Sequence, residues 1–147
     1  MPKTDLTSMT LPALTEWVTG ILGEPKFRAG QIYRWVHQKR VSSFGEMTNL
    51  SAALRQKLED TAFLTTLTTR RRLESRLDET VKLLLELPDR NCVEAVLMRY
   101  EHGLSLCIST QVGCRMGCKF CASTLGGLIR SLTPAEMLGE VYEAERQ

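Results

Sequence analysis

The sequence predicts an α+β fold, in which a small helical bundle precedes β-hairpins and the first βα unit of an α/β architecture. Apolar residues recur at helical spacing up to about residue 63. After that point the segments become short and rich in β-branched and apolar residues, with turn residues between them. A helical pattern returns near the end of the chain. We therefore expect a helical domain over 1–63 and a mixed domain over 64–147.

Composition indicates a soluble globular protein. Of the 147 residues, 43% are apolar and 24% are charged, which is the balance of a folded domain. No apolar run approaches the roughly 20 residues that span a bilayer, and "MPKTDLTSMTLPALTEW" lacks the pattern of a secretory signal. We expect a cytoplasmic protein with no membrane contact. Its five cysteines would then be reduced, which favours metal binding or catalysis over disulfides.

Three helices are predicted in the first domain. Thr10 can cap the first, with Pro12 in its first turn and Gly23 as its stop. The second fits 28–39, where apolar and aromatic residues have helical spacing. Ser51 is the expected cap of the third, whose apolar positions are Leu54, Leu58 and Phe63. Such a bundle is a common platform for nucleic acid, and it would serve equally as a lid or spacer.

Two clusters of basic residues have an RNA-binding and a structural interpretation. The first is interleaved with aromatic residues and consists of Lys26, Arg28, Arg34, Lys39 and Arg40. The second consists of Arg70, Arg71, Arg72 and Arg76. Basic side chains among aromatics suit phosphate contacts and base stacking. Solvated charges on elements whose aromatics are core produce the same pattern, so the residues alone leave both interpretations open.

Four strands are predicted in the second domain, over 63–75, 79–88, 92–100 and 104–110. If "YEHG" turns the last hairpin, Val96 opposes Cys107 and Glu94 opposes Ser109. Because side chains alternate along a strand, these four would share one face. The other face, expected to point into the core, would hold Leu104, Leu106 and Ile108.

Glu94 and Cys107 are the candidate catalytic residues of this hairpin. As diagonal neighbours on one face they would lie within reach of one small substrate. The alternative is that Glu94 is a solvated strand residue and Cys107 a buried thiol.

The stretch "QVGCRMGCKFCAS" brings Cys114, Cys118 and Cys121 into one short loop after a predicted strand. Structural zinc takes four protein ligands, so three cysteines leave it one short. Three thiolates suit a 4Fe–4S cluster with one iron open to a small molecule. Glycines at 113 and 117 would relieve the crowded backbone, and Phe120 could shield the cofactor. A final helix follows, with Thr133 and Glu136 at capping-box spacing and Pro134 in its first turn.

The cysteine spacing, with an aromatic residue before the third cysteine, resembles the radical S-adenosyl-L-methionine (AdoMet) enzymes. The stretch "CISTQVGCRMGCKFCASTLGGLIRSLTPAEMLGEV" resembles the bacterial ribosomal RNA (adenine-C2) methyltransferase family of that superfamily, which also methylates transfer RNA. "EPKFRAGQIYRWVH" and "FGEMTNLS" are similar to its helical accessory domain, and "CVEAVLM" to its strand with a catalytic glutamate. A sister family that methylates adenine C8 shares the cysteine motif, but "QVGCR" and "ASTLGGL" are closer to the C2 family.

The resemblance implies a role for each matching residue. Cys114, Cys118 and Cys121 match the ligands of a 4Fe–4S cluster whose fourth iron chelates AdoMet. Glu94 matches the proton acceptor, and Cys107 a thiol that helps to resolve a covalent enzyme–RNA intermediate. The implied partners are 23S ribosomal RNA and transfer RNA, together with an electron donor such as flavodoxin. The basic residues of the helical domain would contact the RNA.

The chain also departs from the family's pattern. The methyl-carrying cysteine of the family lies near the C-terminus of a chain more than twice this long, and no residue here corresponds to it. We therefore expect the N-terminal portion of such an enzyme, inactive alone, with the start of a radical AdoMet (β/α) barrel. Cys92 matches no family residue and is expected to be a small strand residue. Gly126 and Gly127 would approach the cofactor, although a plain turn explains them equally.

Two other function classes use the same residues. One is a non-enzymatic RNA-binding module in which the cysteines hold structural zinc. The other is a small iron–sulfur electron carrier, which would normally enclose its cluster with four protein ligands.

Overall fold

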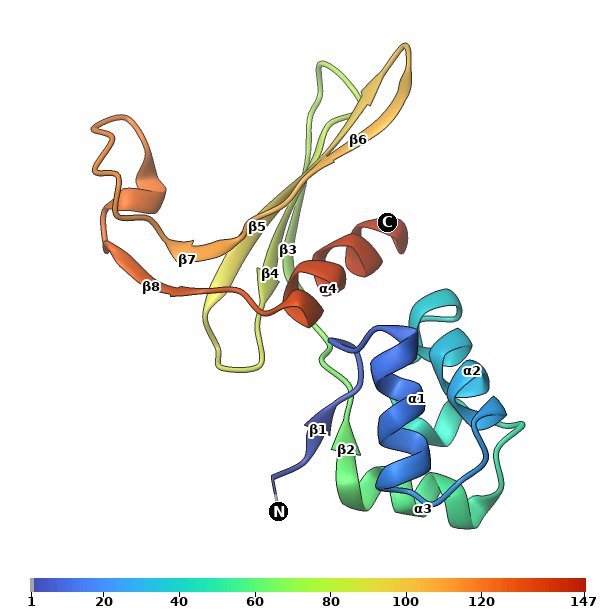
Figure 1. Ribbon diagram of the computed structural model, residues 1–147. Coiled ribbons are helices and arrows are strands. Elements are labelled where there is room, and N and C mark those ends of the chain that lie inside the picture. The colour runs from blue at the N-terminus through green and yellow to red at the C-terminus, as the bar shows by residue number, and fades with distance from the viewer. Residues whose placement is uncertain (1) are drawn as a thin grey trace. The chain divides into compact units, whose positions relative to one another are not determined.

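The structure is a computed structural model that describes residues 2–147. The chain divides into two compact units, the first ending at Thr65 and the second beginning at Thr66 (Figure 1). Helices dominate the first unit, and an antiparallel sheet with one helix dominates the second, so the α+β prediction is confirmed. Within the described residues, no helix combines the length and hydropathy that a membrane span requires.

The first unit packs its helices around one apolar core. In chain order its elements are β1 (Thr4–Asp5), α1 (Leu11–Gly20), α2 (Phe27–Tyr33), a π-helical turn (Arg34–Gln38), a 3₁₀ turn (Phe44–Glu46), α3 (Ala52–Thr61) and β2 (Ala62–Phe63). The predicted caps are confirmed, because Thr10 Oγ1 accepts from Ala13 N and Ser51 Oγ accepts from Leu54 N. Fully buried side chains of this core include Leu14, Ile32, Met47 and Leu58.

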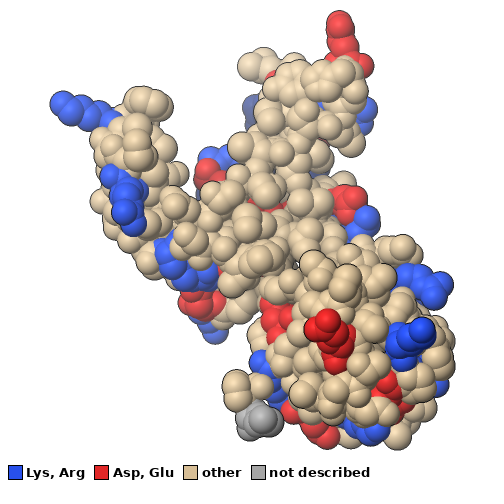
Figure 2. Space-filling view, viewed as in Figure 1, with Lys and Arg blue, Asp and Glu red and all other residues tan. Residues whose placement is uncertain are grey.

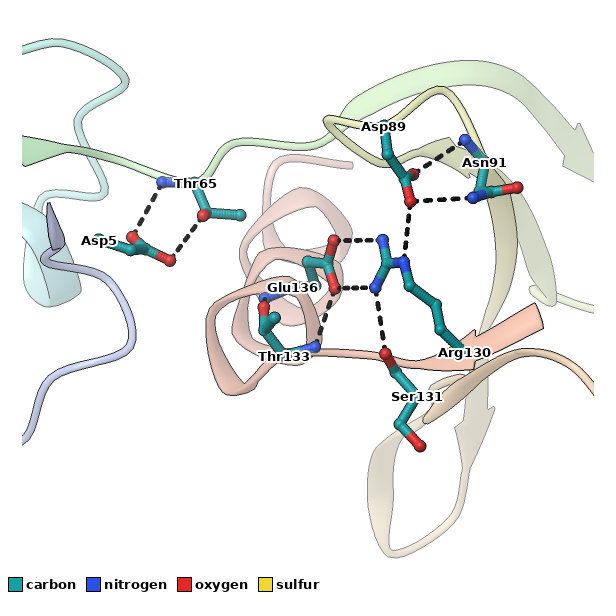
Figure 3. A network of polar contacts seen from close by, with 8 residues as sticks. All are labelled: Asp5, Thr65, Asp89, Asn91, Arg130, Ser131, Thr133 and Glu136. Atoms are coloured by element: carbon teal, nitrogen blue, oxygen red, sulfur yellow. Dashed lines mark hydrogen bonds and ion pairs between the residues drawn. The ribbon is translucent and has the colours of Figure 1, made fainter. Parts of the chain in front are cut away.

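The third helix is shorter than predicted. It ends at Thr61, and Phe63 lies in β2, with 43% of its surface exposed. β2 pairs in parallel with β1, and the backbone N–H of Leu6 donates to Phe63 O. The Asp5 carboxylate accepts hydrogen bonds from the N–H and hydroxyl of Thr65 (Figure 3). These distant partners satisfy backbone groups that the helix would otherwise have satisfied, so the chain leaves the helix early.

The second unit is built on a four-stranded antiparallel sheet in the order β3–β4–β5–β6. The strands are β3 (Thr68–Glu74), β4 (Val81–Glu86), β5 (Cys92–Tyr100) and β6 (Gly103–Cys107). Alternate residues of β4 and β5 are buried, and with residues of α4 (Pro134–Glu145) they form a second apolar core. The opposite side of the sheet, here called the open face, carries Lys82, Leu84, Glu94 and Cys107.

The cysteine loop, residues 114–127, lies between two short strands that the sequence did not predict. β7 (Gln111–Gly113) pairs antiparallel with β8 (Leu128–Ser131). A short hairpin therefore follows β6 and precedes α4 in the chain, and it projects away from the four-stranded sheet (Figure 1). At the start of α4 the predicted capping box is confirmed, with Thr133 Oγ1 accepting from Glu136 N and the Glu136 carboxylate accepting from Thr133 N.

One predicted core position is wrong. Leu104 has 60% of its surface exposed, whereas Leu106 and Ile108 are half-buried. Leu104 pairs with Arg99 near the end of the β5–β6 hairpin, and that hairpin extends past α4 (Figure 1). The alternation of side chains was predicted correctly, but the helix that covers this face does not reach Leu104.

Candidate functional site

The hairpin register that the sequence predicted is confirmed. Val96 pairs with Cys107 across β5 and β6. Two residues beyond the last pair of the ladder, the Ser109 hydroxyl donates to the Glu94 carbonyl oxygen at 2.7 Å. Glu94 and Cys107 therefore lie on the same face of the sheet, as expected.

These two side chains line one hollow of about 570 Å³ on the open face. Its wall also includes Leu84, Cys92, Ser109 and Ser123. Cys107 is an exposed free thiol, so the alternative interpretation of a buried thiol is wrong. Cys92, expected to be only a small strand residue, faces the hollow because it lies two positions before Glu94 on the same strand.

Glu94 has a cationic partner that the sequence analysis missed. Lys82 Nζ lies 2.7 Å from Glu94 Oε1, and both side chains are about half exposed. Lys82 pairs with Val96 across β4 and β5, which places it diagonally next to Glu94. The turn "LPDRN" was the signal that could have found it, because the register of that hairpin follows from the turn. The ion pair holds the Glu94 carboxylate in position on the open face.

The cysteine loop is closed at its base by backbone contacts. The N–H of Cys114 donates to Gly127 O at 3.1 Å, and the N–H of Cys121 donates to Cys118 O at 3.2 Å. Gly113 has a φ of +74°, and a Cβ there would lie 2.0 Å from Gly127 O. Only glycine therefore permits this close approach of the two strands at the loop's base.

The thiols of the loop suit metal binding by their chemistry. Cys114, Cys118 and Cys121 are all free, and Cys118 is exposed. Among residues 2–147, no three His, Cys, Asp or Glu side chains are gathered closely enough to hold a metal ion. Three free thiols in one short loop match the donor set of an iron–sulfur cluster. Because these thiols are not gathered around one point, the assignment of the three cysteines as cluster ligands stays a prediction. Phe120 is 95% exposed, and its shielding role also stays a prediction.

Glu140 of α4 is a buried carboxyl that no sequence pattern singles out. Its side chain is completely buried, and Oε2 accepts from the N–H of Ser109 at 3.0 Å. Oε1 has no hydrogen-bond partner among the described residues. Burial raises the pKa of Glu140 to about 7, with the Ser109 N–H opposing the shift. Because Ser109 also bonds to the Glu94 carbonyl, this acid supports the wall of the hollow.

Comparisons with known proteins show what the chain is similar to. Residues 4–64 match the model of the ribosomal RNA large subunit methyltransferase N-terminal domain.

The similarity to known proteins extends beyond residues 4–64. The chain is 54% identical over 143 residues to the probable dual-specificity RNA methyltransferase RlmN of Lachnospira eligens, covering 97% of this chain and 41% of that protein. It is 55% identical over 144 residues to the corresponding protein of Lachnoclostridium phytofermentans, covering 98% and 40%. A crystal structure of a radical SAM methyltransferase from Sphaerobacter thermophilus superposes with a TM-score of 0.86 at 38% identity, covering 97% and 42%. The chain thus spans about two fifths of the length of these relatives.

In the helical unit, part of the predicted basic patch forms a pocket of about 290 Å³. Its walls are Gln31, Arg34, Trp35, Lys39 and Asn49. The Trp35 indole N–H donates to Asn49 Oδ1 at 2.5 Å, and Lys39 Nζ lies 3.8 Å from the indole centroid. The ammonium group therefore covers the face on which a base would stack, and the pocket suits a phosphate better than a base.

The other basic residues of the patch do not line this pocket. Arg28 lies over the Phe27 ring and donates to Gln31 Oε1 at 2.8 Å. Lys26 and Arg40 are absent from the pocket's walls, and Arg40 has a φ of +54° after the π-helical turn. Of the five basic residues that were predicted to contact RNA, Arg34 and Lys39 are the two that line this pocket.

Proposed function

We propose that this chain is the substrate- and cofactor-binding part of a radical AdoMet methyltransferase that methylates C2 of an adenine in 23S ribosomal RNA and transfer RNA. One observation carries the proposal: the hollow is lined both by Glu94 and Cys107 and by Ala122 and Ser123 of the cysteine loop. The loop that would hold the cofactor and the two groups that would act on the base thus border one space.

The three thiols of the loop would hold the cofactor. Cys114, Cys118 and Cys121 would supply three thiolates to a 4Fe–4S cluster, which would leave one iron open to AdoMet. When bound, this cluster supplies the electron that starts radical chemistry on AdoMet. Such chemistry suits adenine C2, because a carbon between two ring nitrogens is electron-poor and does not attack the AdoMet methyl group. The electron would come from a soluble donor such as flavodoxin. Such a donor fits a cytoplasmic location.

Glu94 and Cys107 would act at the base itself. Methylation at C2 requires that the hydrogen bound to this carbon leaves as a proton, and Glu94 is the acceptor. Lys82 orients the acceptor through its ion pair. Cys107, exposed on the same face, is the thiol that helps to release the RNA from its covalent adduct. The base must be unstacked to enter the hollow, as for other enzymes that modify a nucleobase.

Anaerobic reconstitution of the 147-residue chain with iron and sulfide tests the cofactor assignment. The expected product is brown and shows an AdoMet-induced change in the electron paramagnetic resonance of the reduced cluster. Cys118→Ala should lose the cluster. Cys92→Ala, which removes a thiol that lines the hollow but lies outside the loop, should keep it.

Three results would contradict the assignment. A colourless chain with one zinc ion would support the zinc-containing RNA-binding module. A cluster that does not respond to AdoMet would support the electron carrier. Equal iron contents in the Cys118→Ala and Cys92→Ala variants would refute the ligand set.

A further inference from the structure

Three side chains form a row across the open face. Arg71 pairs with Leu84 across β3 and β4, and Leu84 pairs with Glu94 across β4 and β5. Paired residues on neighbouring strands project from the same face of a sheet. Adjacent strands lie about 5 Å apart, so the backbones of Arg71 and Glu94 are about 10 Å apart. Arg71 therefore stands on the same surface as the candidate proton acceptor, two strands away.

Arg71 differs from its neighbours in its ion-pair partners. Arg70 donates to both carboxylate oxygens of Glu86, at 2.7 and 2.6 Å. Arg72 pairs with Glu74 at 2.7 Å, and its register partner Leu83 belongs to the buried face. No carboxylate in the described part of the chain forms an ion pair with Arg71. The open face is thus left with an uncompensated guanidinium at this position.

Leu84 connects this guanidinium to the hollow. It is half-buried and lines the hollow together with Glu94 and Cys107. The row therefore runs from a free positive charge, over an apolar side chain, to the polar groups of the hollow. An unpaired nucleotide can span this row, because its charged phosphate is joined through the sugar to a base that has flat apolar faces and polar edges.

We propose that Arg71 binds a phosphate of the RNA substrate, so that the attached nucleotide lies over Leu84 with its base in the hollow beside Glu94 and Cys107. This inference deepens the proposed function and rests on it. The guanidinium suits the role because its planar set of donors can bind two phosphate oxygens at once. Lys82, the other cation of this part of the face, is already paired with Glu94.

Fluorescence anisotropy of the 147-residue chain with a labelled RNA hairpin that bears one unpaired adenine tests the proposal. Arg71→Ala should weaken binding about tenfold, the loss expected for one charge-assisted hydrogen-bonded contact. The slope of log affinity against log salt should fall by about 0.7, the value for one phosphate on a single strand. Arg72→Ala is the matched control, because it removes the same charge from the adjacent position on the other face. Arg71→Lys should keep most of the salt slope.

Several outcomes would overturn the proposal. These are equal losses of affinity for Arg71→Ala and Arg72→Ala, an unchanged salt slope, and a wild-type chain that does not bind the RNA. Thermal unfolding of both variants should match, which excludes misfolding as the cause. Cluster loading, measured on the same proteins, reports separately on the proposed function. A chain that loads no cluster but shows the Arg71 effect would refute the radical chemistry and leave the phosphate contact standing.

Discussion

The carboxylate of Glu140 accepts a hydrogen bond from the backbone N–H of Ser109 at 3.0 Å, and so joins α4 to the segment between β6 and β7. The Ser109 hydroxyl in turn donates to the Glu94 carbonyl at 2.7 Å. Two hydrogen bonds therefore connect a fully buried acid to the backbone of the candidate proton acceptor. The wall of the hollow depends on a residue that does not line it.

We predict that Glu140 makes stability depend on pH. Its pKa is raised by burial to about 7, from an ordinary value of 4.5, so the folded chain keeps a proton that the unfolded chain releases. The stabilisation is complete below pH 4.5 and is lost as the pH rises through 7. The free energy of unfolding should fall by about 3 kcal/mol across this window, measured by urea unfolding at a series of pH values.

Glu140→Gln is the matched control for this prediction. Its amide oxygen can still accept from Ser109, and it resembles the protonated acid without titrating. The difference in unfolding free energy between wild type and this variant should change with pH, and the variant should be the more stable protein above pH 7. Parallel pH profiles for the two proteins would show that Glu140 is not the titrating group.

Arg130 should be important for stability because it neutralises a buried acid. It donates to both carboxylate oxygens of Glu136, at 2.8 and 2.7 Å, and to Asp89 at 2.8 Å (Figure 3). The Glu136 side chain is only 7% exposed. Arg130→Ala would leave that charge unpaired and should lower the free energy of unfolding by about 3 kcal/mol. Asp89→Asn, at the exposed end of the network, should lower it by less than about 1 kcal/mol. Similar losses in the two variants, measured by urea unfolding, would refute this reasoning.

Gly113 should tolerate alanine less well than Gly117. Both glycines have positive φ, at +74° and +69°, so alanine strains the backbone at either position by about 1 kcal/mol. At Gly113 the new Cβ would also lie 2.0 Å from Gly127 O, whereas at Gly117 it meets no atom within 4 Å. Gly113→Ala must therefore open the bond between Cys114 N and Gly127 O. Hydrogen exchange at the Cys114 amide should accelerate in this variant and stay slow in Gly117→Ala; equal rates would contradict the prediction.

The pocket of the helical unit should contribute to RNA affinity through Lys39. Lys39→Ala removes the charge over the Trp35 ring and should weaken binding of a ribosomal RNA fragment about fivefold, with a smaller salt dependence. Lys57→Ala is the control of equal charge, because Lys57 is already paired with Glu24 at 2.9 Å. In Figure 2, basic side chains on this unit are interspersed with acidic ones. A general charge effect would therefore weaken both variants alike, and would refute a specific role for Lys39.

The features that sequence patterns predicted correctly are those with nearby partners. Thr133 and Glu136 cap α4 three residues apart, and Val96 and Cys107 meet across a short turn. The missed features depend on residues far apart in the chain. β1 pairs with β2 across more than fifty residues. β7 and β8 are too short to show a periodic pattern and find each other only across the cysteine loop.

The hollow also combines features that local sequence patterns predict with features that depend on residues far apart in the chain. Two local patterns predict a candidate site before any packing is known. These are the spacing of Cys114, Cys118 and Cys121 and the hairpin register. Alternation along a strand says which residues share a face, but it does not say which face a helix covers. Packing of α4 on one side of the sheet settles that choice, because apolar side chains are buried wherever a second layer can cover them. That same packing buries Glu140, exposes Leu104 and leaves Glu94 and Arg71 on the open side.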